Sequence, residues 1–288
     1  MPRRHAVPSV VPSTLAVVLT IAGSDSSAGA GIQADLKTIS AGGGYGATVI
    51  TAVTAQNTRA VTAAAELATE LIRAQIDAVF ADLRVAAVKS GMLASRRVID
   101  TVVAALREYR PAHYVCDPVM VSKTGFPLLS PDAVEALARE LLPLATLVTP
   151  NVHEARALTG LAVETPADAE EAGRRLVRAG AAAVLVKGGH LRERPATDVL
   201  VTRDGTRVFE GEHLEARHTH GTGCTYSAAI ATQLAHGRAL PDAIRIAKAY
   251  VTEAIRGGLP IGGGAGPTDH FFFLRGGYPR PWIRRLSG

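Results

Sequence analysis

The chain has 288 residues, of which 47% are hydrophobic and 20% charged, a composition typical of a globular protein with one large domain or two small ones. The net charge is +5, but the basic residues are scattered and only 5% of residues are aromatic, which argues against nucleic acid as a partner. Two cysteines give no basis for a disulfide framework and fit a reducing compartment, so we expect a cytoplasmic protein.

The first residues imitate a secretory signal, because early arginines precede an apolar stretch. We interpret this signal as false, since Pro12, Ser13 and Thr14 interrupt the apolar run and LAVVLTIAG is typical of a buried strand. No later stretch approaches the ~18 apolar residues that a membrane-spanning helix needs. We expect a flexible extension at residues 1–14, a single domain at residues 15–275 and a tail at residues 276–288.

Apolar runs of strand length alternate with longer amphipathic segments along the chain. The expected strands cover residues 15–22, 47–55, 85–89, 114–117, 146–149 and 183–187. Helical spacing is found at residues 32–43, 66–83, 95–109, 131–142 and 166–180, and a hairpin is expected from residues 197–201 and 207–210 around RDGT. The series predicts a three-layer α/β/α fold with a mostly parallel sheet, and ligands at the carboxyl ends of its strands.

The glycine loop after the first strand, AGSDSSAGAGIQADLKT, is the first candidate for binding chemistry. It matches the dinucleotide pattern G-x-G-x-x-A, but no acid follows at the end of the second strand, and no G-K-[ST] marks a P-loop. The loop is expected to place Asp25 and Asp35 near the sheet edge. Each acid also has a simpler interpretation, because Asp25 is a good helix cap and Asp35 fits a solvated helix residue.

Three further features follow apolar strands and favour phosphate chemistry. Asp117 in CDPVM and Glu154 in TPNVHEARALTG are acids at the sheet edge, where carboxylates together with phosphate oxygens would hold Mg²⁺. Helix capping by Asn151 and Glu154 is the competing interpretation. Lys187 in VLVKGGH adds a cation, and GTG in HTHGTGCTYSAA offers backbone amides at a helix N-terminus. Together these features predict phosphoryl transfer.

The chain resembles the bacterial hydroxymethylpyrimidine kinase/phosphomethylpyrimidine kinase family of thiamine biosynthesis, in the ribokinase superfamily. The resemblance covers residues 15–267 and rests on AGSDSSAGAGIQADLKT, VTAQNT, VKSGML, DPVM, TPNVHEA, VKGGH and HGTGCT in this order. It implies a ribokinase-like fold with a minimal lid, a homodimer, ATP and Mg²⁺. It also implies two successive transfers from ATP, to 4-amino-5-hydroxymethyl-2-methylpyrimidine and then to its monophosphate.

The resemblance further implies roles for individual residues. Contacts to the pyrimidine fall on Gly23, Asp35, Gln56, Met92 and Val119. The metal positions match Asp117 and Glu154, and the nucleotide-binding positions match Lys187, Thr222, Asn151 and Lys248. The catalytic group comprises the anion hole at Gly221 and Gly223, the adjacent base Cys224, and Lys187. One departure is Ala28, which stands where glycine is common.

Cys224 is expected to accept the proton released in the first transfer. It stands at a helix N-terminus near Lys187, where the pKa of a thiol can fall well below the usual ~8.5, so that thiolate would be present near neutral pH. The wider superfamily also places an aspartate base at this position. The competing interpretation is a small buried hydrophobic side chain.

Three alternative functions compete with the pyrimidine kinase. A pyridoxal or pyridoxine kinase of the same superfamily would use the same phosphate machinery, although the amide of Gln56, which can donate and accept, favours the pyrimidine. A cysteine hydrolase would use Cys224 with His220 or His218, which leaves the acids and the lysine at the sheet edge without roles. A metal-binding module built from His218, His220 and Cys224 lacks an identifiable fourth ligand.

Overall fold

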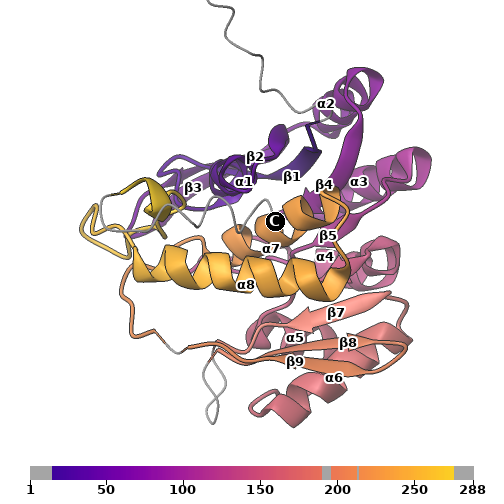
Figure 1. The fold of residues 1–288 in the computed structure, drawn as a ribbon. Helices are drawn as coiled ribbons and strands as arrows, with labels where there is room; N and C mark the ends of the chain where they lie inside the picture. Colours follow the sequence, from indigo (N-terminus) through magenta and orange to yellow (C-terminus); the bar gives the residue numbers. More distant parts are fainter. Residues whose placement is uncertain (1–14, 190–195, 213, 276–288) are drawn as a thin grey trace, which may run out of the picture.

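A computed structural model describes residues 15–189, 196–212 and 214–275. Within these residues a nine-stranded sheet has the order β3-β2-β1-β4-β5-β6-β7-β8-β9 (Figure 1). The strands from β2 to β7 pair in parallel, β3 joins antiparallel at one edge, and β8 and β9 join antiparallel at the other. Their bounds are β1 Val17–Asp25, β2 Tyr45–Gln56, β3 Val61–Glu66, β4 Val85–Ser90, β5 Tyr114–Cys116, β6 Leu147–Val148, β7 Ala183–Val186, β8 Asp198–Thr202 and β9 Thr206–Phe209.

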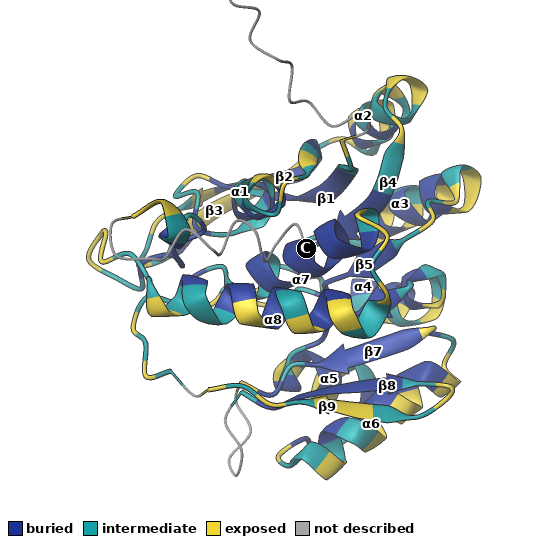
Figure 2. Cartoon of the chain, in the orientation of Figure 1, coloured by how far each residue is buried: buried dark blue, intermediate teal, exposed yellow. Residues whose placement is uncertain are grey.

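Helices cover both faces of this sheet, so the predicted three-layer arrangement is confirmed. One face carries α1 Gly31–Ala41, α7 Thr222–Ala235 and α8 Leu240–Arg256. The other carries α2 Thr69–Asp82, α3 Arg96–Tyr109, α4 Pro131–Ala136, α5 Val152–Thr159 and α6 Pro166–Arg178. Helix α7 is buried along most of its length, whereas α8 lies over it and alternates between buried and exposed residues (Figure 2).

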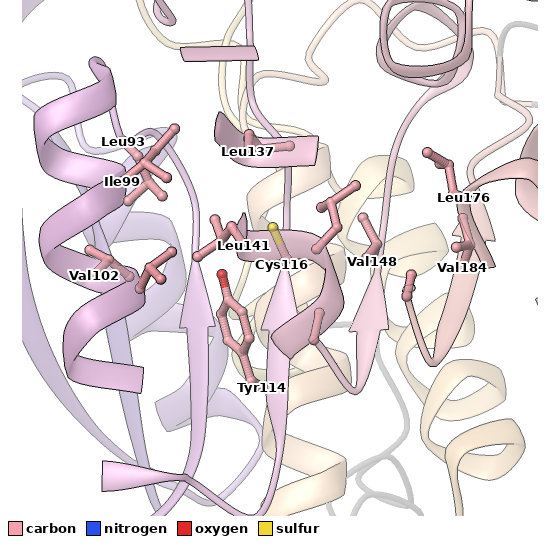
Figure 3. Close-up of a cluster of buried hydrophobic side chains, with 14 of the residues drawn as sticks. Leu93, Ile99, Val102, Tyr114, Cys116, Leu137, Leu141, Val148, Leu176 and Val184 are labelled. Carbon is pink, nitrogen blue, oxygen red and sulfur yellow. The ribbon is translucent and has the colours of Figure 1, made fainter. Parts of the chain in front are cut away.

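Neighbouring residues of the central strands point into two different cores, as the two-residue repeat of a strand requires. Val184 of β7 packs with Cys116 and Val148 in the core on the side of α2 to α6 (Figure 3). The adjacent Leu185 packs with Val115 in the core under α7 and α8. Burial on both faces explains why these strands are apolar without alternation.

The structure also corrects the expected elements in three places. Residues 61–66 form β3, which was not predicted, and the helix expected from residue 66 begins at Thr69 after an extended Ala68. The helix expected at residues 131–142 is α4, followed by a π-helical turn at Leu137–Leu141 and a 3₁₀ turn at Leu142–Leu144, which includes Pro143. Helix α8 was not predicted either.

Three further observations concern the ends of the chain, the hairpin and membrane association. The expected extension at 1–14 and the expected tail at 276–288 lie outside the described residues. The expected hairpin is confirmed as the antiparallel pair β8 and β9. In the part of the chain that the structure describes, no helix is both long and apolar enough to cross a membrane.

Candidate active site

Six parallel strands end at the same edge of the sheet, and most of the predicted site residues lie at these ends or just after them. Gln56 is the last residue of β2, the glycine loop follows β1, and Met92 follows β4. Asp117, Glu154 and Lys187 follow β5, β6 and β7, and the N-terminus of α7 packs close to this edge. Parallel pairing therefore brings together segments that are far apart in the sequence.

Asp117 and Lys187 form a buried ion pair at this edge. Lys187 Nζ lies 2.9 Å from Asp117 Oδ1, and the same carboxylate accepts hydrogen bonds from Thr149 Oγ1 and Ser227 Oγ, each at 3.2 Å. Burial alone would raise the pKa of Asp117, but the charges of Lys187 and Lys89 outweigh burial and lower it. Asp117 is therefore a carboxylate at neutral pH, and Lys187 is its cation.

Glu154 both caps a helix and adds a second acid to this group. Its Oε2 accepts the amide hydrogen of Asn151 at 2.7 Å, and Asn151 Oδ1 accepts the amide hydrogen of Glu154 at 2.9 Å, so the capping interpretation is confirmed. Burial raises the pKa of Glu154 to about 7; Lys187 opposes this shift and Asp117 adds to it. A carboxyl group with a pKa near 7 is only partly ionised at neutral pH, so a nearby cation would stabilise its carboxylate form.

Asp117 and Glu154 are suited to hold Mg²⁺ together with the phosphates of a nucleotide. Mg²⁺ prefers oxygen ligands and is commonly held by one or two carboxylates together with substrate phosphates. Asp117 and Glu154 provide that number, and a bound cation would favour the carboxylate form of Glu154 against the effect of burial. Within the described ranges, no group of three or more His, Cys, Asp or Glu side chains could form a metal site made of protein ligands alone.

Two glycines at the start of α7 allow close approaches to other parts of the site. Gly221 is the N-cap residue, with φ of +81°, and a Cβ on it would overlap the carbonyl oxygen of Gly29. A Cβ on Gly223 would lie 3.4 Å from Lys187 Nζ. The first-turn amides of a helix have no partner within the helix. The amide of Thr222 donates to the carbonyl oxygen of Thr219 at 3.3 Å, so the amides of Gly223 and Cys224 are those suited to an anion.

The thiol of Cys224 differs from the sequence-based expectation. Burial raises its pKa to about 11; Lys89 and the Gly31 amide oppose the shift, and Asp35 and Asp117 add to it. The expectation of a pKa well below ~8.5 is therefore wrong, because loss of hydration outweighs the helix N-terminus and the nearby cations. In the structure as described, Cys224 is a thiol at neutral pH.

Asp35 and Lys89 form a second ion pair, completely buried between α1 and β4. Lys89 Nζ lies 2.8 Å from Asp35 Oδ2 and 3.0 Å from Oδ1, and Thr20 Oγ1 donates to Oδ2 at 2.6 Å. Burial raises the pKa of Asp35 and by itself would lower that of Lys89, but the charge of Asp35 raises the pKa of Lys89. Both carboxyl oxygens accept hydrogen bonds, so the pair is ionic. The interpretation of Asp35 as a solvated residue is wrong, and the sequence did not assign a role to Lys89.

Of the residues expected to line the heterocycle pocket, Gly23 and Met92 are in contact, and Val119 lies in the loop after β5. A Cβ on Gly23 would lie 2.8 Å from Met92 Sδ, so these two residues are in contact. Met92 also lines a cavity of about 350 Å³ between β2, β3 and residues 127–131. Val119 is half-buried in the loop after β5, where its amide donates to the carbonyl oxygen of Asp117 at 2.8 Å.

Gln56 reaches the glycine loop through His220. Its amide nitrogen, as placed, is 3.2 Å from His220 Nε2, which lies 2.9 Å from Asp25 Oδ2. Asp25 also accepts hydrogen bonds from the amides of Ser27, Gly29 and Ala30, so it holds the loop before α1. The helix-cap interpretation is wrong, because no side chain caps the N-terminus of α1. Burial would raise the pKa of Asp25, but these hydrogen bonds hold it at about 2.

Lys248 pairs with a different acid from that of Lys187. Its ammonium is 2.6 Å from Asp198 Oδ2 and also donates to the carbonyl oxygen of Ala196. Asp198 in turn accepts the amide hydrogen of Gly188 at 3.0 Å and the hydroxyl of Tyr226 at 3.0 Å. Lys248 therefore holds the start of β8 beside the glycines that follow Lys187.

The remaining motif residues have structural partners. His218 Nδ1 accepts the amide hydrogen of Gly266 at 3.0 Å, and His220 is bound to Asp25, so the two histidines do not form a metal cluster with Cys224. Ala28 has φ of +60°, in the left-handed region, which explains physically why glycine suits this position.

A three-layer fold with an acid, a lysine and a helix N-terminus at the carboxyl edge of its sheet defines a ribokinase-like kinase. The family model described as phosphomethylpyrimidine kinase matches residues 25–269. The hydroxymethylpyrimidine/phosphomethylpyrimidine kinase of Rhizobium meliloti is 52% identical over 259 residues, which cover 89% of this chain and 97% of that protein. The chain therefore belongs to the phosphomethylpyrimidine kinase family.

Solved structures agree with this assignment. The phosphomethylpyrimidine kinase of Clostridium difficile has a TM-score of 0.75 and 46% identity, over 83% of this chain and 99% of that one. A Bacillus subtilis pyridoxal kinase, solved as an ADP complex, has a TM-score of 0.85 and 38% identity, over 91% of this chain and 100% of that one. The expected family, ribokinase-like fold and phosphotransferase class are confirmed.

Proposed function

We propose that this enzyme uses ATP and Mg²⁺ to phosphorylate 4-amino-5-hydroxymethyl-2-methylpyrimidine and then the resulting monophosphate, in thiamine biosynthesis. The observation that carries the proposal is the meeting of three features at one point. Lys187 Nζ is 2.9 Å from Asp117 and 3.4 Å from the position of a Cβ on Gly223, in the first turn of α7. An acid, a cation and free helix amides are the parts that phosphoryl transfer requires.

The nucleotide side of the site comprises Lys187, Thr222, Asn151 and Lys248. Lys187 neutralises phosphate charge, and Lys248 fixes β8 and, through Asp198, the amide of Gly188. Bound Mg²⁺ would neutralise charge on the phosphates, and Asp117 and Glu154 are the residues that would hold it. Amides of Gly221, Gly223 and Cys224 would bind the oxygens of the transferred group, where negative charge is greatest.

The heterocycle side comprises Gly23, Asp35, Gln56, Met92 and Val119. Gly23 and Met92, which lie in contact, would provide the apolar part of this side, and Gln56 would provide a polar contact. Asp35 acts through its ion pair with Lys89, since both its oxygens are already bound. Cys224 would accept the hydroxymethyl proton in the first transfer, in the small fraction of molecules that carry a thiolate.

The test supplies purified protein, ATP and Mg²⁺ with the hydroxymethylpyrimidine, its monophosphate or pyridoxal, and separates the products. The proposal expects a monophosphate and then a diphosphate from the pyrimidine. Lys187→Met should slow both transfers, since one cation serves both. If pyridoxal is phosphorylated with the higher kcat/KM, the enzyme is a pyridoxal kinase, as the Bacillus subtilis neighbour is described.

We also infer that the enzyme is a cytoplasmic homodimer. Strand β3 is an edge strand with five of its six residues exposed, and Val53 of the adjacent β2 is 47% exposed, which favours burial against a second copy. Both cysteines, Cys116 and Cys224, are free thiols, which fits a reducing compartment. Light scattering should give twice the 30.0 kDa of one chain, and a monomer mass would contradict the inference.

A further inference from the structure

One nitrogen of His220 lies between a carboxylate and the side-chain amide of Gln56. His220 Nε2 is 2.9 Å from Asp25 Oδ2 and 3.2 Å from the atom placed as Gln56 Nε2. The three residues come from the end of β1, the end of β2 and the turn before α7. Asp25 and His220 are buried, with 3% and 7% of their surface exposed, so this contact is shielded from water.

The contact with Asp25 decides where the proton lies. The carboxylate of Asp25 already accepts hydrogen bonds from Ser27, Gly29 and Ala30, and an ionised carboxylate can only accept. A ring nitrogen 2.9 Å from one of its oxygens must therefore carry a hydrogen. Protonated Nε2 is a donor, so it cannot accept a hydrogen bond from the NH₂ group of Gln56.

Thr54, on the other side of the Gln56 amide, independently indicates how this amide is oriented. Its hydroxyl has one hydrogen, and it lies 2.9 Å from the carbonyl oxygen of Ser24, which can only accept, and 3.2 Å from the atom placed as Gln56 Oε1. With that hydrogen directed to Ser24, Thr54 presents lone pairs to Gln56. Amide oxygen and nitrogen are distinguished by such networks, and both neighbours require the amide oxygen toward His220 and the NH₂ group toward Thr54.

We propose that Asp25 and His220 are positioning residues that fix the amide of Gln56 so that it presents an N–H, and not its carbonyl oxygen, to the heterocycle. The amide oxygen shares the Nε2 hydrogen of His220 with Asp25 in a three-centre hydrogen bond, and one amide hydrogen is directed to Thr54. The second amide hydrogen is then available to the substrate. Gln56 then reads a ring nitrogen with a lone pair and does not accept from an exocyclic amino group. This assignment rests on the proposed function for the identity of the ring.

The first experiment measures the proton directly and needs no substrate. A long-range ¹H–¹⁵N spectrum of the imidazoles distinguishes a protonated from an unprotonated ring nitrogen, and the signals of His220 are those lost in His220→Gln. The proposal expects hydrogen on Nε2 of His220 at neutral pH. An unprotonated Nε2 would overturn it, whatever the enzyme phosphorylates.

The second experiment tests whether His220 acts through Gln56. His220→Phe keeps a ring but removes the donor, whereas His220→Gln keeps an N–H near the same place. The proposal expects His220→Phe to raise the KM for the pyrimidine by about tenfold, the size of one hydrogen bond, with little change in the KM for ATP. His220→Gln should restore most of the loss. The matched control is His236→Gln, since His236 is exposed and its ring bonds only to the carbonyl oxygen of Gly42 in the described structure.

A double-mutant cycle separates positioning from simple support of the loop. In a Gln56→Met background, which has no amide to orient, His220→Phe should have no further effect on the pyrimidine KM. If the two losses instead add, or if His220→Gln loses as much as His220→Phe, His220 does not position Gln56. If the wild-type enzyme does not phosphorylate the pyrimidine at all, the proposed function fails, while the spectrum still decides the assignment of the proton.

Discussion

The proposed base, Cys224, can be tested by the different pH dependence of the two transfers. Burial raises the pKa of its thiol to about 11. At pH 7.5 roughly one molecule in 3,000 would carry a thiolate. An alcohol must lose its proton as it attacks, whereas a phosphate monoester, with a second pKa of about 6, is already an anion above about pH 7. Only the first transfer therefore needs the thiolate.

The ratio of the two rates isolates Cys224 from the other titrating groups. Glu154, with a pKa of about 7, and Lys187 serve both transfers, so their titration cancels in the ratio. Since thiolate increases tenfold per pH unit far below its pKa, the rate of the first transfer relative to the second should rise about 100-fold between pH 7 and pH 9. The measurement is single-turnover product formation from each substrate at saturating ATP and Mg²⁺.

The variant Cys224→Ala provides the control. Its first transfer should have no such rise, so the advantage of the wild-type enzyme over the variant should be small at pH 7 and grow about tenfold per pH unit. A wild-type ratio that stays constant between pH 7 and pH 9 would refute the thiolate as the base. If Cys224→Ala slows both transfers by the same factor, Cys224 shapes the anion hole and accepts no proton.

Three other outcomes are expected. Glu154→Gln should weaken both transfers at limiting Mg²⁺ while the fold persists, and wild-type turnover under that condition would leave Glu154 with its capping role alone. Gln56→Met removes the amide N–H that is proposed to donate to a ring nitrogen, a hydrogen bond worth on the order of 1–3 kcal/mol, so it should lower kcat/KM for the pyrimidine; an unchanged kcat/KM would show that Gln56 does not read the ring. Burial and the charge of Lys37 lower the pKa of His270 to about 4, so between pH 6.5 and pH 4 the unfolded chain binds a proton that the folded protein does not, and stability should fall by about 3 kcal/mol. Urea unfolding of His270→Gln should lack this component, and an unchanged pH dependence in the variant would contradict the assignment.

The central sheet could be predicted because its strands are short apolar runs between amphipathic helices, a pattern that directly reflects burial on both faces. Strand β3 could not, because VTAAAE has little β-propensity and five of its six residues are exposed. Its pairing with β2, from Ala52 opposite Glu66 to Gln56 opposite Val61, supplies the missing stabilisation. Helix α8 could have been predicted, because Pro241 lies in its first turn and apolar residues follow at helical spacing.

The ion pair of Asp35 with Lys89 could not be predicted from sequence patterns. Asp35 and Lys89 are 54 residues apart, and they meet because Thr20 of β1 pairs with Lys89 of β4 while α1 packs against β1. A pattern within one segment contains no information on this register. The same limit explains the error on Cys224, since its position at a helix N-terminus can be read from the sequence whereas its loss of hydration cannot.

The loop after β1 and the turn before α7 both need glycine because their backbones touch in the folded protein. A Cβ on Gly221 would overlap the carbonyl oxygen of Gly29, and a Cβ on Gly29 would overlap the ring of His220. The loop after β1 and the turn before α7 are thus in direct backbone contact, and the bond from His220 to Asp25 fastens them at the same place. Because protein interiors are close-packed, a shift of either segment must move the other. We therefore expect the loop after β1 and the N-terminus of α7 to move as one unit, which in the proposed reaction would keep the acceptor oxygen in register with the amides of α7.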